Sequence, residues 1–185
     1  ANACIRKYFS KPVKAYFSKE LAIRIMLASI VLRAASQELG VDVKLSYYDK
    51  YYVRAYVVLM KGARKADESL KKLGYVVFNK RSGEYFIVKD LSELFNIPHD
   101  KHYVIAGPIW CGNICEKEFL SKVSKVVMER EYLRYKELTK LLQMLNAELS
   151  MPPLYYNVDM LGKILKKSIP PLNSLIECLV SNGYK

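Results

Sequence analysis

The sequence is poor in the features that mark a membrane segment, a secretory signal or a disulfide framework. Its most apolar run spans only residues 21–32 and contains Arg24, whereas a helix needs about 20 apolar residues to cross a bilayer. The N-terminal stretch has basic residues but no apolar core before a small-residue cleavage site, so we predict no membrane partner and a cytoplasmic location. The 4 cysteines are too few and too scattered for a disulfide framework.

The sequence also lacks the patterns of a chemical centre. It has no Ser-His-Asp arrangement, phosphate loop or dinucleotide fingerprint, so we assign no catalytic and no cofactor-binding residue. Cys111 and Cys115 lie near His99 and His102 in the sequence. Their spacing differs from a common zinc knuckle and the histidines precede the cysteines, so free thiols are favoured over a metal site. The chemistry of the chain is predicted to stop at binding.

What the chain has in excess is positive charge. It holds 30 Lys plus Arg against 18 Asp plus Glu, for a net charge of +12, within a composition of 51% hydrophobic and 26% charged residues. The composition is that of a globular protein. The charge favours polyanions or acidic membrane surfaces as partners, although a solvated basic surface gives the same count.

The first third of the chain predicts a helix and a strand pair. A helix begins at Ser18 and runs to about Leu39, where Gly40 is expected to end it in a left-handed conformation. Its apolar residues cover most of its circumference, so we expect it to be covered on more than one side. Residues 41–48 and 51–60 are rich in β-formers and predict an antiparallel hairpin.

The next segments predict a second helix and hairpin, then a helical region. Residues 63–73 indicate a helix with Gly74 at its end, and residues 75–78 and 84–88 flank a turn whose Gly suits a positive φ. Gly107-Pro108 is interpreted as a restart of the chain. Apolar residues at helical spacing predict two helices, or one long bent helix, in residues 116–149.

The end of the chain predicts a helix-turn-helix at residues 157–183. Residues 158–166 form an amphipathic helix, and Ser168 and the two prolines after Ile169 lead into a second one. The apolar residues of this second helix are expected to form its buried face. They are Leu172, Leu175, Ile176, Leu179 and Val180.

Two kinds of residue point to RNA. Residues 44–57 combine tyrosines with Arg54 and two lysines, and aromatics beside cations suit stacking on splayed bases and contact with phosphates. Tyrosine is also a favoured strand residue, and lysines are common on solvated helix faces, so structural explanations compete. The RNA-binding candidates are Arg6, Lys7, Lys11, Lys14, Arg24, Tyr51, Tyr52, Arg54, Lys163, Lys166, Lys167 and Lys185.

Several blocks together resemble the tRNA (guanine(26)-N2)-dimethyltransferases of archaea and eukaryotes. They are Ala3–Tyr8 with Glu20–Arg24, Leu45–Val57, Gly62–Leu70 with Leu73–Tyr75, Gly107–Trp110 with Gly112 and Glu118–Phe119, and Pro153–Tyr156 with Asn182–Lys185. The blocks keep the family's order over nearly the whole chain.

The resemblance implies a Rossmann-like methyltransferase that uses S-adenosylmethionine to methylate a guanine amine in tRNA. It also implies that this chain is the C-terminal portion, without the half that binds the cofactor, so no cofactor is expected for the chain alone. Departures occur at Lys50, Asn113, Cys115 and residues 77–79, and the chain stops where the family continues into a wing-like hairpin. A fragment and a shortened paralogue that lost catalysis are both left open.

The expected fold is α+β. Residues 1–62 are predicted to be the terminal helix and antiparallel strand pair of a methyltransferase-like domain, and residues 63–185 a mixed RNA-binding domain ending in a winged-helix-like unit. The expected role is tRNA binding and positioning, inactive without a missing methyltransferase half. The rivals are a stand-alone, non-catalytic RNA-binding or ribosome-associated protein and a DNA-binding helix-turn-helix protein.

Overall fold

The computed structural model describes residues 1–49, 51–98, 100–130 and 133–183, apart from the side chains of residues 161, 164 and 165. The helices are α1 (Asn2–Tyr8), α2 (Ser18–Ala35), α3 (Ala63–Leu70), the 3-10 helix η1 (Leu91–Asn96), α4 (Lys117–Glu129), α5 (Tyr135–Glu148), α6 (Val158–Leu165) and α7 (Leu172–Ser181). The strands are β1 (Leu39–Asp49), β2 (Tyr52–Lys61), β3 (Leu73–Asn79), β4 (Tyr85–Val88) and β5 (Tyr103–Trp110).

The strands form two antiparallel sheets. β1 pairs with β2 in a long hairpin, and β4, β3 and β5 form a three-stranded sheet in that order. Both predicted hairpins are therefore confirmed, and Gly83 in the second turn has the expected positive φ of 73°. The mixed α+β class is confirmed as well, because helices pack on both sheets.

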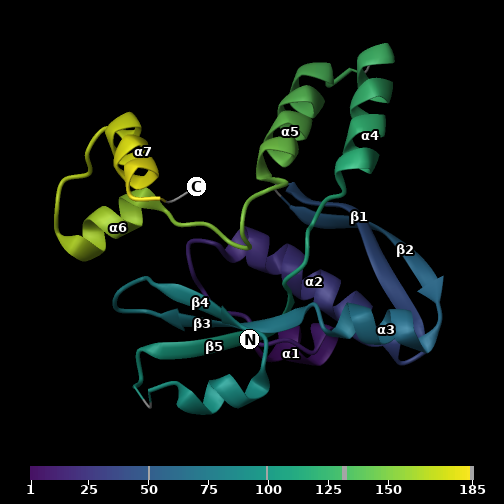
Figure 1. The fold of residues 1–185 in the computed structure, drawn as a ribbon, viewed down its shortest axis with the longest axis horizontal. Helices are drawn as coiled ribbons and strands as arrows, with labels where there is room; N and C mark the ends of the chain where they lie inside the picture. Colours follow the sequence, from purple (N-terminus) through teal and green to yellow (C-terminus); the bar gives the residue numbers. More distant parts are fainter. Residues whose placement is uncertain (50, 99, 131–132, 184–185) are drawn as a thin grey trace.

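Helix α2 lies between the two sheets and fills the centre of the molecule (Figure 1). One of its sides packs on the three-stranded sheet, in a cluster of Val13, Phe17, Leu21, Ile25, Val76, Phe78, Ala106, Ile109 and Leu154. Its other side packs on the hairpin, in a cluster of Ile23, Leu27, Val31, Ala34, Val41, Val43 and Trp110. The expectation that this helix is covered on more than one side is confirmed.

Helices α4 and α5 stand together at the end of β1 (Figure 1). Their small core consists of Leu45, Cys115, Leu120 and Leu145. The connection to β1 is made by the backbone, because the Ser46 amide donates to the Ile114 carbonyl over 2.8 Å and the Glu116 amide donates to the Lys44 carbonyl over 2.9 Å. Lys117–Glu129 and Tyr135–Glu148 thus form two separate helices, which is one of the two predicted alternatives for this region.

Two helix ends differ from the prediction. Helix α2 ends at Ala35 and Gly40 lies inside β1. A Cβ at Gly40 would lie 2.6 Å from the Lys65 carbonyl oxygen, so this glycine permits α3 to approach the strand closely rather than ending a helix. Helix α3 ends at Leu70, and Gly74 is part of β3.

Gly107-Pro108 also differs from the prediction, since it lies inside β5 and does not restart the chain. The strand tolerates a proline because β5 is an edge strand of its sheet. On its outer side the Lys11 amide donates to the Gly107 carbonyl over 2.8 Å, and the Gly107 amide donates to the Lys11 carbonyl over 2.9 Å. This exchange fixes the segment between α1 and α2.

Helices α6 and α7 are present where the helix-turn-helix was predicted, and they stand away from the rest of the molecule (Figure 1). The predicted buried face of α7 is wrong. Leu172, Ile176, Leu179 and Val180 are exposed, and Leu175 is only half-buried, because among the described residues α7 has little beyond α6 to pack against. The winged-helix assignment and the division at residue 62 stay predictions.

Across the described ranges, no helix is both long enough and apolar enough to span a membrane.

Candidate functional site

The tip of the β1-β2 hairpin meets the N-terminal helix around one hollow. This hollow, of about 460 Å³, is lined on one side by Tyr51 and Tyr52 and on the other by Cys4 and Tyr8 of α1. Arg6 and Lys7 lie in the last turn of α1 and are exposed. The structure therefore brings the two tyrosines of the hairpin tip together with Cys4 and Tyr8 of α1, and Arg6 and Lys7 lie on the same helix outside the lining of this hollow.

Arg54 lies on the exposed face of β2 between tyrosines. Its guanidinium carbon is 5.1 Å from the centre of the Tyr52 ring, and Tyr47 is its cross-strand partner on β1. Hydrogen bonding with Tyr56, and then the charges of the neighbouring tyrosines, raise the pKa of Arg54 above its usual value. The hairpin thus presents a fixed cation beside flat aromatic surfaces.

Lys11 and Lys14 lie between α1 and α2. The backbone of Lys11 is held by Gly107, whereas the side chains of both lysines are exposed. They extend the basic surface of α1 toward the three-stranded sheet. The N-terminal basic residues predicted from the sequence are all at the surface.

Arg24 differs from the other candidates because it is only 4% exposed. Its Nε donates to Glu20 Oε1 over 2.8 Å, and its NH1 nitrogen donates to the carbonyls of Trp110 at 2.8 Å and Gly112 at 3.1 Å. A buried guanidinium with these partners stabilises the fold. We therefore leave Arg24 out of the proposed RNA-contacting surface.

The C-terminal lysines line one hollow on the α6-α7 unit. Lys163, Lys166 and Lys167 surround about 510 Å³ of open space together with Ser168, and all three lysines are exposed. Lys166 ends α6 with a left-handed φ of 52°, and the Lys167 amide donates to the Gly162 carbonyl over 3.1 Å. The turn therefore holds the three ammonium groups on one side. Lys185 lies outside the described residues.

Sequence reasoning missed a hollow between α2, the end of β1 and α5. It is lined by Lys19, Glu20, Tyr47, Tyr48, Tyr51, Glu148 and Tyr155 among others, and its volume is about 830 Å³. A smaller pocket of about 190 Å³ adjoins it and shares Glu20, Glu148 and Tyr155. The feature of the sequence that could have indicated this hollow is Glu148, a carboxylate at the end of the apolar stripe of α5.

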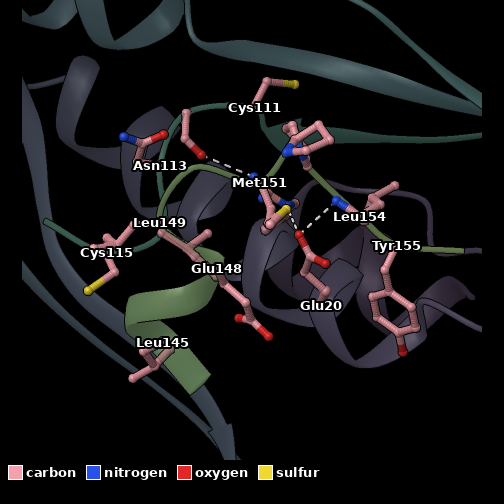
Figure 2. A pocket seen from close by; sticks show the side chains of 15 residues that line it. Glu20, Cys111, Asn113, Cys115, Leu145, Glu148, Leu149, Met151, Leu154 and Tyr155 are labelled. Carbon is pink, nitrogen blue, oxygen red and sulfur yellow. Dashed lines mark hydrogen bonds and ion pairs between the residues drawn. The ribbon is translucent and has the colours of Figure 1, made fainter. Parts of the chain in front are cut away.

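Glu20, Glu148 and Tyr155 are among the residues that line the smaller pocket, and Figure 2 shows the Glu20 carboxylate directed toward Met151 and Leu154. Glu20 Oε1 accepts hydrogen bonds from Arg24 Nε and from the Leu154 amide, both over 2.8 Å. Desolvation, and then the charge of Glu20, raise the pKa of Glu148. Desolvation, and then the charges of Glu20 and Glu148, raise the pKa of Tyr155. The charge of Glu20 therefore contributes to the raised pKa of both Glu148 and Tyr155.

The described residues contain no cluster of three or more histidine, cysteine or acidic side chains that is arranged to hold a metal ion. Cys115 is buried, and desolvation followed by the charge of Glu116 raises the pKa of its thiol to about 11. Burial likewise raises the pKa of Cys111. Both behave as free thiols, and His99 lies outside the described residues.

A nucleotide-type cofactor does not fit the strand-to-helix turns of this chain. Such cofactors use a glycine-rich turn between a strand and a helix, which lets the backbone approach the ligand. The turn from β2 to α3 contains only Gly62, and residues 111–116 between β5 and α4 contain only Gly112. A Cβ at Gly112 would meet the ring of Trp110 at 2.7 Å, so this glycine serves internal packing.

Comparison with known proteins gives a consistent result. The family model described as N2,N2-dimethylguanosine tRNA methyltransferase matches residues 1–185. The tRNA (guanine(26)-N(2))-dimethyltransferase of Pyrococcus horikoshii is 36% identical over 184 residues, which are 100% of this chain and 46% of that protein. The Methanobrevibacter smithii protein of the same name is 34% identical over 98% of this chain and 48% of its own length.

A solved structure agrees with the sequence matches. The complex of Trm1 from Pyrococcus horikoshii with S-adenosyl-L-methionine superimposes with a TM-score of 0.85 and 34% identity, covering 98% of this chain and 47% of that one. The chain thus spans about half the length of the relatives it matches. Because the family model covers every residue, the chain belongs to the N2,N2-dimethylguanosine tRNA methyltransferase family.

Proposed function

We propose that this chain binds and positions tRNA as part of a tRNA guanine N2-dimethyltransferase that uses S-adenosylmethionine. The observation that carries the proposal is the grouping of exposed cations into two surfaces. One consists of Arg6 and Lys7 on α1, the helix whose Cys4 and Tyr8 line a hollow with Tyr51 and Tyr52, and the other is the hollow formed by Lys163, Lys166 and Lys167. A net charge of +12 favours phosphate contacts at both.

The two surfaces suit different parts of a folded RNA. The lysine hollow offers three ammonium groups beside one carboxylate, Asp159, and this excess of positive charge suits a phosphate backbone irrespective of sequence. The hairpin tip adds exposed tyrosine rings, and Tyr51 is 94% exposed, which suits stacking on unpaired bases. Methylating a base amine inside a folded RNA requires exposing that base at a cost of a few kcal/mol, and contacts on both surfaces would help to offset it.

Other parts of the proposal rest on the family resemblance. The division into residues 1–62 and 63–185, the winged-helix-like character of α6-α7 and the cytoplasmic location are proposed with it. We place the binding of S-adenosylmethionine outside this chain, because its strand-to-helix turns do not fit the cofactor.

The salt dependence of tRNA binding tests the lysine hollow. On a plot of log affinity against log salt concentration, each phosphate contact makes the negative slope steeper by about 0.7 to 0.9. Replacing Lys163, Lys166 and Lys167 by glutamine should therefore lower the slope by about 2 to 3. A matched control replaces three exposed lysines of the α4-α5 pair, namely Lys125, Lys136 and Lys140. An equal loss in the control, or an unchanged slope in the test variant, contradicts the proposed contact.

A methylation assay separates the proposal from its rival. The protein that contains this chain should transfer labelled methyl groups from S-adenosylmethionine to tRNA. A native product of the size of this chain, 21.3 kDa, that binds tRNA without methylating it would favour a stand-alone RNA-binding protein. Tighter binding to duplex DNA than to tRNA would favour the DNA-binding class.

A further inference from the structure

The segment between α5 and α6 is anchored to the rest of the molecule by a cluster of four tyrosines. They are Tyr16 before α2, Tyr85 at the start of β4, and Tyr155 and Tyr156 of the segment itself. We infer that this tyrosine cluster fixes the position of the lysine hollow relative to the basic surface of α1, so that both contact one tRNA. The inference rests on the proposed function and adds positioning residues to it.

Two consecutive residues of the segment contact the beginning of α2. Leu154 is 4% exposed in the core between α2 and the three-stranded sheet, and its amide donates to Glu20 Oε1 over 2.8 Å. The Tyr155 hydroxyl donates to the Tyr16 carbonyl over 2.7 Å, and the centres of the two rings are 6.2 Å apart. A buried side chain and two hydrogen bonds therefore hold this part of the segment in place.

Tyr156 contacts the three-stranded sheet instead. Its ring stacks on that of Tyr85, with ring centres 4.8 Å apart and an angle of 25° between the planes. Tyr85 in turn packs edge-on against Phe17, with ring centres 5.1 Å apart. The Tyr16 hydroxyl donates to the Gly83 carbonyl over 3.0 Å, which fixes the turn before β4. Stacked and edge-on pairs are favoured geometries for aromatic side chains, so the Tyr156 ring lies on an ordered surface.

Helix α6 begins directly after the tyrosine cluster. Asn157 follows Tyr156 and caps the helix, because its side chain accepts from the Met160 amide over 2.9 Å. Within the described ranges, no hydrogen bond or ring contact joins residues 158–183 to residues 1–153. The direction in which α6 leaves Tyr156 therefore determines where the lysine hollow lies.

A fixed spacing between two binding surfaces raises the affinity for a ligand that reaches both of them. Helix α1 and the α6-α7 unit lie apart in the molecule (Figure 1), so a large folded RNA is suited to contact both, whereas a short RNA contacts one at a time. If the segment were free, binding at the second surface would have to order it again. Ordering one backbone residue lowers an affinity by about tenfold.

Two variants of the whole protein that contains this chain remove the restraint in different ways. Tyr156→Ala deletes the stacked ring, whereas a Gly-Ser-Gly-Ser insertion between Tyr156 and Asn157 keeps the ring and makes the connection to α6 flexible. We expect each variant to lower the affinity for tRNA by about tenfold, and the two changes together to lower it no further. The affinity for a short RNA hairpin should be unchanged in all of them, because each surface is intact.

Two substitutions serve as controls, and one label reports on motion. Tyr156→Phe keeps the stacked ring and should keep the affinity for tRNA. Tyr135→Ala makes the same truncation at an exposed tyrosine of α5 and should also keep it. A dye on the exposed Cys178 of α7 should show lower fluorescence anisotropy in Tyr156→Ala and in the insertion variant, because α6 and α7 then move independently of the rest of the molecule.

The insertion variant separates positioning from a direct contact, since Tyr156 is 50% exposed. A loss of tRNA affinity in Tyr156→Ala alone would show that the ring itself contacts RNA, and it overturns the inference. Unchanged anisotropy in both variants, or an equal loss for the short hairpin, overturns it as well. If the unmodified protein binds tRNA and the insertion variant binds it equally tightly, the positioning role alone is wrong; if the unmodified protein does not bind tRNA, the proposed function fails too.

Discussion

Replacing Arg24 by methionine removes the cation at the centre of the fold while keeping an unbranched side chain of similar length. Among the residues that the structure describes, the change leaves the Glu20 carboxylate with the Leu154 amide as its one remaining partner, and it takes the guanidinium away from the carbonyls of Trp110 and Gly112. Removing one partner of a buried ion pair costs about 3 to 5 kcal/mol, because the other charge stays buried and unpaired.

The lower part of that range applies here. Arg24 has a side-chain exposure of 5%, but that of Glu20 is 18%, so water partly screens the stranded carboxylate. We therefore expect Arg24→Met to lower the free energy of unfolding by about 3 kcal/mol. Urea unfolding measures it, and with a slope of roughly 2 kcal/mol per molar urea the midpoint should fall by about 1.5 M. The single tryptophan, Trp110, reports on the same contact by fluorescence.

Two further variants identify the cause of the loss. Arg64→Met changes an exposed arginine of α3 and should alter stability by less than about 0.5 kcal/mol. If the cost arises from the stranded carboxylate, adding Glu20→Gln to Arg24→Met should recover about 1 kcal/mol. A loss below about 1 kcal/mol in Arg24→Met, or a double variant that is the sum of two independent losses, would refute the reasoning.

Two other predictions concern the core and the thiols. Phe17 is 0% exposed and packs edge-on against Phe78 with ring centres 5.5 Å apart. Phe17→Ala should therefore lower the free energy of unfolding, measured in urea, by about 3 to 5 kcal/mol. A loss below about 1 kcal/mol would show that the site collapses around the smaller side chain. The pKa of Cys115 is raised to about 11 by desolvation, so little thiolate is present near neutral pH. A disulfide reagent should therefore label the exposed Cys178 quickly, and Cys115 only after unfolding or at strongly alkaline pH. Equal labelling rates for the two cysteines in the folded protein would contradict the burial of Cys115.

Local patterns predicted the elements better than their ends. The β1-β2 hairpin and the helical regions follow from β-rich runs and from apolar residues at helical spacing, which act within a few residues. Gly40 and Gly74 were interpreted as helix ends because glycine favours such positions. Their actual role is tertiary, since a Cβ at Gly74 would meet Cys111 Sγ and the Val88 carbonyl oxygen, both at 2.8 Å. A contact between segments far apart in the sequence leaves no local signal.

The same distinction between local and long-range features holds for the candidate sites. The residue types that suit RNA, lysines near α6 and tyrosines in the hairpin, were visible in the sequence because charge and aromatic content are local. Which residues share a hollow was not visible. Tyr51 lines one hollow together with residues of α1 and another together with residues of α5, and Glu148 lines the second of these from a helix that follows by about half the chain.

Two residues one turn apart on α2 explain how these distant segments are held together. Glu20 accepts from the Leu154 amide, which fixes the segment that carries Tyr155, and Arg24 donates to the carbonyls of Trp110 and Gly112, which fixes the end of β5. Each side chain also holds the other through the 2.8 Å ion pair. The pair thus joins the end of β5 to the segment that carries Tyr155 through a single helical turn, so the contacts of Arg24 hold distant parts of the fold together.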